Sequence, residues 1–161
     1  MKIRLARPED VEKIIRIEAI CFPPAEAAQA EDFYARYAAF PEIFFVAEDE
    51  DGTIAGFING CATDKPELPD ELYHDAKLHI PDGAYQTVFG LDVLPEYRRH
   101  GVGAQLIRHH VEMARQRGKK GVVLTCKDHM IHFYERVGFV CKGASASEHG
   151  GAKWNDMLLE F

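Results

Sequence analysis

The sequence contains no apolar run that approaches the roughly 18 residues of a membrane-spanning helix, so we expect no membrane segment and no membrane partner. Its first ten residues, Met1 to Asp10, alternate in polarity and lack the apolar block of a signal peptide. A cytoplasmic location is therefore the expectation. Basic residues are also scarce, because 19 lysines and arginines stand against 26 aspartates and glutamates. The formal net charge of −7 argues against a nucleic-acid partner, which would require a basic face.

Patterns of metal ligands and of paired cysteines are missing as well. The four cysteines are far apart and form no C-x-x-C motif, so buried reduced thiols are favoured over disulfides, which the even number still permits. The eight histidines include no His-Glu-x-x-His arrangement, and no spacing of cysteine and histidine suggests zinc. We expect no metal site.

What the sequence does contain is the material for one folded domain over residues 1–161. A length of 161 residues and a hydrophobic content of 47% allow a sizeable core, and no internal repeat or interdomain linker interrupts the chain. Oligomeric state is left open between a monomer and a homodimer.

The segment from Val88 to Ala104, VFGLDVLPEYRRHGVGA, has the most informative pattern in the chain. An apolar run of strand length ends at Pro95, a basic loop with Gly101 and Gly103 follows, and a helical spacing of apolar residues begins after Gln105. A helix start that follows a glycine loop presents unpaired N–H groups and the positive end of the helix dipole. This arrangement predicts a site for a phosphate-like anion.

Two familiar phosphate motifs are absent from this segment. It has neither G-x-x-x-x-G-K-[ST] nor G-x-G-x-x-G, and what remains is Arg98-x-x-Gly101-x-Gly103. Glycine suits these positions because a Cβ atom would hold the backbone away from a phosphate. The alternative is a simple glycine turn in front of an amphipathic helix.

Strands and helices alternate along the rest of the chain. Periodicity predicts strands at residues 2–6, 43–47, 53–61, 85–94, 121–125, 139–142 and 153–161, and helices at 8–22, 26–40, 101–117 and 129–137. Gly90 inside a strand indicates a bulge or a splayed strand pair. The strands at 85–94 and 121–125 flank a helix, so we expect them to be parallel. Residues 62–83 form a long excursion that is either functional or merely variable.

Three ordered motifs resemble the GCN5-related N-acetyltransferases, and within them the arylalkylamine N-acetyltransferases. Cys21-Phe22-Pro23 followed by Glu26-Ala27-Ala28 resembles the substrate loop of that subgroup. Arg98-x-x-Gly101-x-Gly103 resembles the pyrophosphate loop of the superfamily, and Phe133-Tyr134-x-x-x-Gly138-Phe139 resembles its distal signature. The resemblance covers nearly the whole chain.

The resemblance implies a mixed α/β (α+β) fold, with a central sheet of about seven strands that splays at an acetyl-CoA site and about four flanking helices. It also implies that the acetyl donor is acetyl-CoA, with the pantetheine arm paired like an added strand against the backbone of residues 91–93. The cofactor-binding residues implied are Leu91, Asp92, Val93, Arg98, Arg99, His100, Gly101, Val102, Gly103, Ala104, Tyr134 and Arg136.

The resemblance also assigns catalytic roles. Tyr134 would lie near the cofactor sulfur and give its proton to the departing thiolate, although an aromatic residue on a short helix is otherwise a core residue. The backbone N–H of Leu91 could stabilise the oxyanion. The amine acetyltransferases carry two histidines as a base relay on the central strand, and those positions here hold Thr87 and Phe89. The base is therefore left open among Glu26, a histidine of the segment from His74 to His79, and a substrate that arrives neutral.

The function that follows from the resemblance is acetyl-CoA-dependent acetylation of a primary amine on a small molecule, which an arylalkylamine would satisfy. One alternative is an acetyl-CoA-binding module with little catalysis, which the missing strand histidines favour. Another is a peptide N-terminal acetyltransferase, because such an enzyme would share every cofactor motif. The sequence does not specify the amine.

Overall fold

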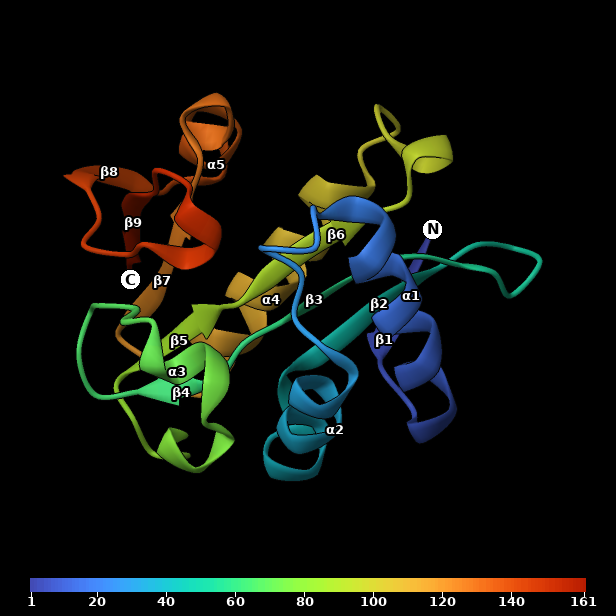
Figure 1. The fold of residues 1–161 in the computed structure, drawn as a ribbon, viewed down its shortest axis with the longest axis horizontal. Coiled ribbons are helices and arrows are strands. Elements are labelled where there is room, and N and C mark those ends of the chain that lie inside the picture. The colour runs from blue at the N-terminus through green and yellow to red at the C-terminus, as the bar shows by residue number, and fades with distance from the viewer.

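The computed structural model describes residues 1–161, which form two β-sheets flanked by helices (Figure 1). The first sheet has the order β1–β2–β3–β6, with bounds Lys2–Leu5, Phe44–Glu48, Ile54–Asn59 and Gly90–Val93. The second has the order β4–β5–β7–β9–β8, with bounds Ala62–Thr63, Tyr85–Val88, Gly121–Cys126, Asn155–Glu160 and Val140–Ala144. The helices are α1 (Val11–Cys21), α2 (Ala30–Ala39), α3 (Glu71–His74), α4 (Val102–Gln116) and α5 (Ile131–Val137).

One stretch of chain, residues 85–94, contributes β5 to one sheet and β6 to the other. Along one edge this stretch stays bonded where the two sheets meet. There the N–H groups of Thr87 and Phe89 donate to the carbonyl groups of Cys61 and Asn59, at 2.8 and 2.7 Å. The two sheets are therefore continuous on this side.

The opposite edge of the same stretch is bonded over only half its length. β5 pairs in parallel with β7 as far as Val88, which lies opposite Leu124. Beyond that point β6 pairs only with β3, so its other edge is open. The splay predicted at Gly90 and the parallel pairing of the strands around α4 are both confirmed.

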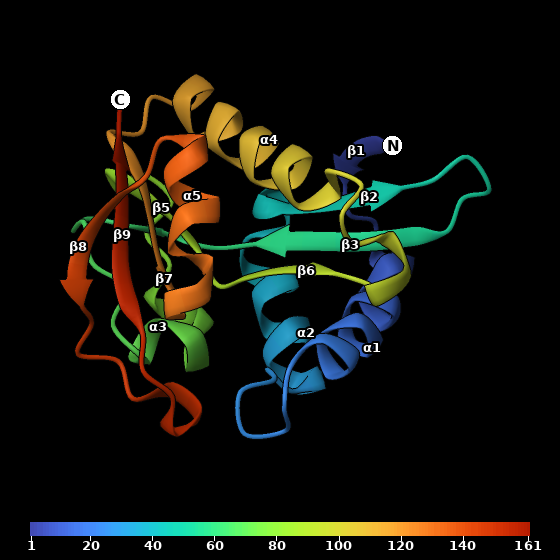
Figure 2. The same cartoon turned by 90° about the horizontal axis from the view of Figure 1, so that it is seen from above.

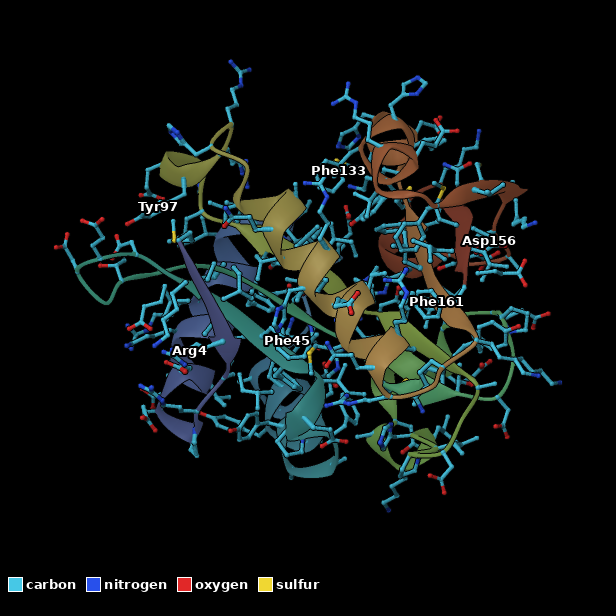
Figure 3. All side chains as sticks on the ribbon, turned by 180° about the vertical axis from the view of Figure 1, so that it is seen from behind. Arg4, Phe45, Tyr97, Phe133, Asp156 and Phe161 are labelled. Carbon is cyan, nitrogen blue, oxygen red and sulfur yellow. The ribbon has the colours of Figure 1, made fainter.

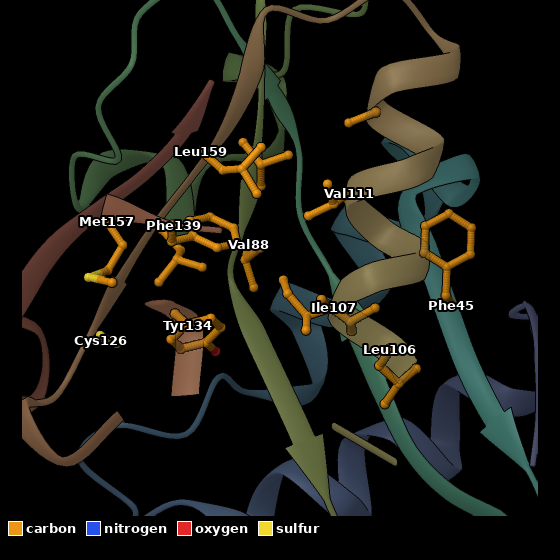
Figure 4. Close-up of a cluster of buried hydrophobic side chains, with 14 of the residues drawn as sticks. Phe45, Val88, Leu106, Ile107, Val111, Cys126, Tyr134, Phe139, Met157 and Leu159 are labelled. Atoms are coloured by element: carbon orange, nitrogen blue, oxygen red, sulfur yellow. The ribbon is translucent and has the colours of Figure 1, made fainter. Parts of the chain in front are cut away.

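The helix α4 packs its apolar stripe against both sheets, and in Figure 2 it lies on the opposite side of β2, β3 and β6 from α1 and α2. Its buried residues recur three or four positions apart: Val102, Leu106, Ile107, His110, Val111 and Ala114. All of these except His110 join a cluster of 17 buried residues that also draws on both sheets (Figure 4). This core holds the splayed strand and the start of α4 in a fixed relation.

His110 is the one polar residue on the buried stripe of α4. Its Nε2 atom bonds to the carbonyl oxygen of Thr87 at 2.9 Å, and the side chain of Gln86 donates to the carbonyl of His110 at 3.1 Å. Burial lowers the pKa of His110 to about 4, so the imidazole stays neutral at physiological pH. These bonds fix β5 to α4 and make His110 a structural residue.

A second cluster of 15 buried residues fills the space between the first sheet and helices α1 and α2. At its edge, the guanidinium of Arg4 on β1 forms ion pairs with Asp10 and Glu48, each at 2.8 Å (Figure 3). Burial by itself favours the protonated form of Asp10, but the hydrogen bonds from Arg4 and from the N–H of Arg7 outweigh it and lower the pKa of this carboxyl. The N-terminal strand is thus tied electrostatically to the start of α1.

The fold departs from the sequence prediction in three places. There are nine strands rather than about seven, because residues 85–94 divide into two strands and the short β4 lies in the predicted excursion. The excursion also holds α3, a fifth helix. The second helix begins at Ala30 instead of residue 26, because Gln29 caps it in a reciprocal pair with Asp32. Glu26 therefore lies in the loop between α1 and α2.

All four cysteines are free thiols. No helix of the structure has the length and apolar character required to cross a membrane.

The junction of the two sheets depends on the absence of a side chain at Gly60. A Cβ atom there would lie 1.7 Å from the carbonyl oxygen of Thr87, which is backbone and cannot rotate away. We predict that Gly60→Ala lowers the free energy of unfolding in urea by about 3 kcal/mol, the upper end of the cost of overpacking. Gly103→Ala is the control, because its Cβ would make only ordinary contacts and alanine favours a helix. Equal stability of the two variants would contradict the prediction.

Candidate active site

The open edge of β6 presents main-chain groups of alternate residues. The N–H of Leu94, just after β6, donates to the carbonyl of Ala55, and a Cβ atom on Gly56 would approach the carbonyl oxygen of Asp92, so residues 92 and 94 turn their main chain toward β3. By alternation, the main-chain groups of Leu91 and Val93 face away from β3. The carbonyl oxygen of Val93 already accepts hydrogen bonds from two side chains, whereas the other outward-facing main-chain groups of Leu91 and Val93 are free to pair with an extended ligand. Those of Asp92 are not free.

A run of unpaired amides lies next to this edge. None of the main-chain N–H groups of residues 99–104 donates a hydrogen bond within the chain, and the first hydrogen bond of α4 is from the N–H of Gln105 to the carbonyl of Gly101. Gly101 caps the helix in the left-handed region with φ +79°, and Arg99 also has a positive φ of 67°. Six successive free donors at the start of a 15-residue helix form a cradle for an anion.

The surroundings of this cradle are basic and open. Arg98, Arg99 and His100 are exposed, and the Nε atom of Arg98 donates to the carbonyl oxygen of Val93 at 3.0 Å. A Cβ atom on Gly103 would meet the ring of Phe133 at 3.5 Å, so α5 approaches the helix start from the other side. Figure 3 shows Tyr97 and Phe133 on either side of the start of α4.

Tyr134 lies on α5 where the two sheets diverge, and in Figure 4 its ring lies between β7 and the stretch that contains β5 and β6. The residue is only 6% exposed. Unlike the hydroxyl groups of Tyr37, Tyr73 and Tyr97, its hydroxyl group has no bonding partner in the chain. Burial raises the pKa of Tyr134 well above its ordinary value, and the charge of Asp92 adds to this. The hydroxyl group is therefore protonated at physiological pH and free to donate.

Comparison with known protein families shows to which family the chain belongs. Residues 11–139 match the model of the acetyltransferase (GNAT) family. The chain belongs to the GNAT family. That family takes its acetyl group from acetyl-CoA, which fits the six free amides and the open strand edge described above. The predicted superfamily and its fold are confirmed.

Individual relatives are more distant. The chain is 29% identical over 143 residues to "Probable hydrolase YhcX" of Bacillus subtilis (strain 168), matching 83% of this chain and 27% of that protein. It is 30% identical over 109 residues to serotonin N-acetyltransferase of Mesocricetus auratus, matching 67% of this chain and 51% of that protein. The chain thus spans between a quarter and half of the length of these relatives.

Among solved structures, the chain is similar to the GphF GNAT-like decarboxylase in complex with isobutyryl-CoA. The TM-score is 0.85, with 23% identity over 99% of each chain. At this level of identity the similarity shows that the fold is shared.

The GNAT chain has no base at the two strand positions that sequence analysis singled out. The hydroxyl oxygen of Thr87 accepts from the N–H of Cys61 at 3.0 Å and is buried. Phe89 is half-buried, with the guanidinium of Arg36 4.5 Å from its ring and Tyr73 5.0 Å away. Both residues are occupied in packing.

The other candidate bases also have structural partners. Glu26 forms an ion pair with Lys127 at 2.6 Å, and its carbonyl oxygen bonds to the ring of His149 at 2.7 Å. The Nδ1 atom of His79 accepts from the N–H of Ala62 at 3.0 Å, and His74 is exposed. The bond to His149 connects the loop between α1 and α2 to the segment between β8 and β9, and Figure 2 shows these two segments close together. The ion pair connects the same loop to the residue that follows β7.

Two buried carboxyl groups lie beside β6, and sequence analysis assigned a side-chain role to neither. Asp92 is 1% exposed and Glu18, on α1, is 6% exposed. Both oxygens of Asp92 and the Oε1 atom of Glu18 are buried without a hydrogen-bond donor. Burial raises the pKa of Asp92 well above its ordinary value, and the charge and hydrogen bonding of Glu18 raise it further. A signal existed in the sequence, because each acid interrupts an otherwise apolar pattern.

The predicted cofactor-binding residues fall into three places. The structure puts Leu91 to Val93 on β6, residues 98–104 on the adjacent loop and helix start, and Tyr134 and the exposed Arg136 on α5. These elements flank one splay, so the residues occupy a common region. Their individual roles remain predictions.

The helix cap at Gly101 offers a test of the anion cradle. Valine at this position adds a β-branched side chain in a strained conformation and moves the free amides, so we predict that Gly101→Val weakens acetyl-CoA binding at least tenfold in calorimetry. Gly118→Val is a matched control, because Gly118 follows the other end of α4 with φ +76° and equally open surroundings. An equal loss in both variants would show that strain, and not the cradle, causes the effect.

Proposed function

We propose that this GNAT chain transfers an acetyl group from acetyl-CoA to the primary amine of a small molecule. The observation that supports this proposal most is the row of six unpaired amides at residues 99–104, next to the open edge of β6. Such a row suits a diphosphate, and the strand edge suits the extended pantetheine arm. The 30% identity to a serotonin N-acetyltransferase supports a small amine as the acceptor.

The chemistry needs a neutral amine, a polarised thioester carbonyl and a proton for the leaving thiolate. An alkyl amine with a pKa near that of lysine is mostly protonated at pH 7, and freeing its lone pair costs about 4 to 5 kcal/mol. Acetyl-CoA supplies the activated acetyl group. The remaining tasks are for the side chains and the main chain of the splay.

Two of these tasks have candidates in the geometry. The outward-facing N–H of Leu91 is available to stabilise negative charge on the carbonyl oxygen. The protonated hydroxyl of Tyr134, which has no bonding partner in the chain, is available to protonate the thiolate. The high pKa of Tyr134 suits an acid that gives up its proton only to a strongly basic group.

A second candidate function is a module that binds acetyl-CoA with little catalysis. The observation that favours it is the structural engagement of Thr87 and Phe89, where a base relay was expected. Thiol release from acetyl-CoA, measured with a panel of alkyl amines, aryl amines and peptides, separates the alternatives. Amine-dependent release supports the enzyme, and a preference for peptides would replace the small acceptor with a protein terminus. Cofactor binding without amine-dependent release would support the module.

Removal of the Tyr134 hydroxyl group tests the acid role. We predict that Tyr134→Phe lowers kcat about 100-fold, the scale of general acid catalysis, and leaves acetyl-CoA affinity within twofold because the ring still packs. Tyr37→Phe is the control, since its hydroxyl bonds to the carbonyl of Ala6. Steady-state kinetics and calorimetry provide the measurements. Full activity of Tyr134→Phe across the pH range would disprove the assignment.

A further inference from the structure

The buried carboxyl groups of Glu18 and Asp92 have few hydrogen-bond donors around them. Three of their four oxygens lack a donor, although a buried carboxylate normally accepts several hydrogen bonds. The fourth, Oε2 of Glu18, accepts from the N–H of Ala28 in the loop between α1 and α2 at 2.9 Å. Two buried ionised carboxylates would cost stability, so one proton shared between Glu18 and Asp92, or a cation in its place, is needed to hold the pair together.

Both carboxyl groups lie close to the main chain of Gly90. A Cβ atom on Gly90 would lie 3.1 Å from Oδ1 of Asp92, 3.5 Å from Oε1 of Glu18 and 3.8 Å from the side-chain nitrogen of Asn59. Gly90 itself is half-exposed and stands at the point where β6 leaves the second sheet. The buried oxygens therefore lie next to the point where the splay opens.

The charges around the carboxyl pair do not balance when both acids are ionised. The ionisable groups that act on Asp92 are Glu18 and Cys21 on α1 and Arg36 on α2, and Asp92 in turn acts on Tyr134 across the splay. Cys21 and Tyr134 are neutral, because burial raises the pKa of each. Arg36 is 3% exposed, and its side chain donates to Asn59 and to the carbonyl of Tyr73. Two carboxylates and one guanidinium leave one negative charge, which a proton or an external cation can neutralise.

We propose that Glu18 and Asp92 form the ammonium-binding end of the acceptor site and accept the proton that the amine loses. This assignment rests on the proposed function and specifies its substrate class as an alkyl amine that arrives protonated. It supplies the base that Thr87 and Phe89 do not provide. It also places base and acid on opposite sides of the splay, with Asp92 on β6 and Tyr134 on α5.

All protons are accounted for over the proposed catalytic cycle. The incoming ammonium displaces the proton that the pair shares, and this proton leaves to solvent. The ammonium then gives one proton to the pair, and its lone pair forms the C–N bond to the acetyl carbon. As the C–S bond breaks, the thiolate takes the proton of the Tyr134 hydroxyl group, which is replaced by a proton from the acylated nitrogen. The net products are the amide, the thiol and one released proton.

The proposal has a consequence for binding that does not depend on turnover. Because a proton on Asp92 and the ammonium group compete for one site, amine affinity should rise about tenfold per pH unit over the range in which Asp92 is protonated. Binding of phenylethylamine to the complex with coenzyme A should release close to one proton at pH 7. Calorimetry in two buffers of different ionisation enthalpy measures this number, and phenylethanol, a neutral analogue, should release none.

The test compares wild-type protein with Asp92→Asn, Glu18→Gln and Glu12→Gln. The last is a matched control, because Glu12 lies on α1 with its side chain 72% exposed. We expect Asp92→Asn and Glu18→Gln to bind phenylethylamine about 10- to 100-fold more weakly, without proton release. We expect both to lose at least 100-fold in kcat/KM while acetyl-CoA affinity stays within twofold. Glu12→Gln should match wild type.

The outcomes separate this inference from the proposed function. If wild type acetylates alkyl amines while both pair variants keep its pH profile and its proton release, the ammonium subsite is disproved and the acetyltransferase stands. If wild type binds acetyl-CoA but acetylates no amine, the proposed function fails and the subsite with it. A preference for neutral aryl amines over alkyl amines would also overturn the subsite.

Discussion

The fold depends on unequal hydrogen bonding along the two edges of residues 85–94. One edge is bonded through β4, the connecting residues and β3, whereas the other is bonded to β7 only up to Val88. If both edges were bonded throughout, the two sheets would merge and no space would remain beside β6. Close backbone contact at Gly60 and the bonds of His110 secure the first edge. The edge of β6 that faces away from β3 can therefore remain unpaired while the strand keeps its position.

Two sets of unpaired polar groups lie along that open edge. The free amides of residues 99–104 lie near one end of β6, and the unpaired oxygens of Glu18 and Asp92 lie beside it. In the rest of a folded chain such groups are normally paired. The donors are suited to an anion and the acceptors to a cation, so the two sets are complementary to the two substrates of an amine acetyltransferase. The left-handed conformation of Arg99, the first residue of the cradle, is a further local strain at this site.

Much of this arrangement was predictable from the sequence. Apolar periodicity located most of the strands and helices, and Gly90 indicated the splay. The glycine spacing at Gly101 and Gly103 indicated the anion cradle. These features are local, since each depends on residues close together in the chain.

Features that depend on distant contacts were not predictable in the same way. Glu18 and Asp92 are separated by 74 positions (92 − 18), and nothing in the sequence shows that α1 brings one against the other. The partners of the ion pair between Glu26 and Lys127 are even further apart in the chain. A single acidic residue in an apolar stripe does indicate a buried charge, but its partner requires the fold.

Asp10 and Asp92 make the stability of the fold depend on pH in opposite directions. Asp10, with its pKa lowered by Arg4, adds stability above the ordinary carboxyl range, and this contribution is lost as the pH falls through its native pKa. Asp92, with its pKa raised, adds a contribution that is complete below the ordinary range and is lost as the pH rises through its native pKa. Folding thus raises the proton affinity of Asp92. A cation bound in place of a proton at Asp92 would therefore stabilise the folded chain. Its effect would be largest in alkaline solution, where the ionised and unoccupied carboxyl pair destabilises the fold most.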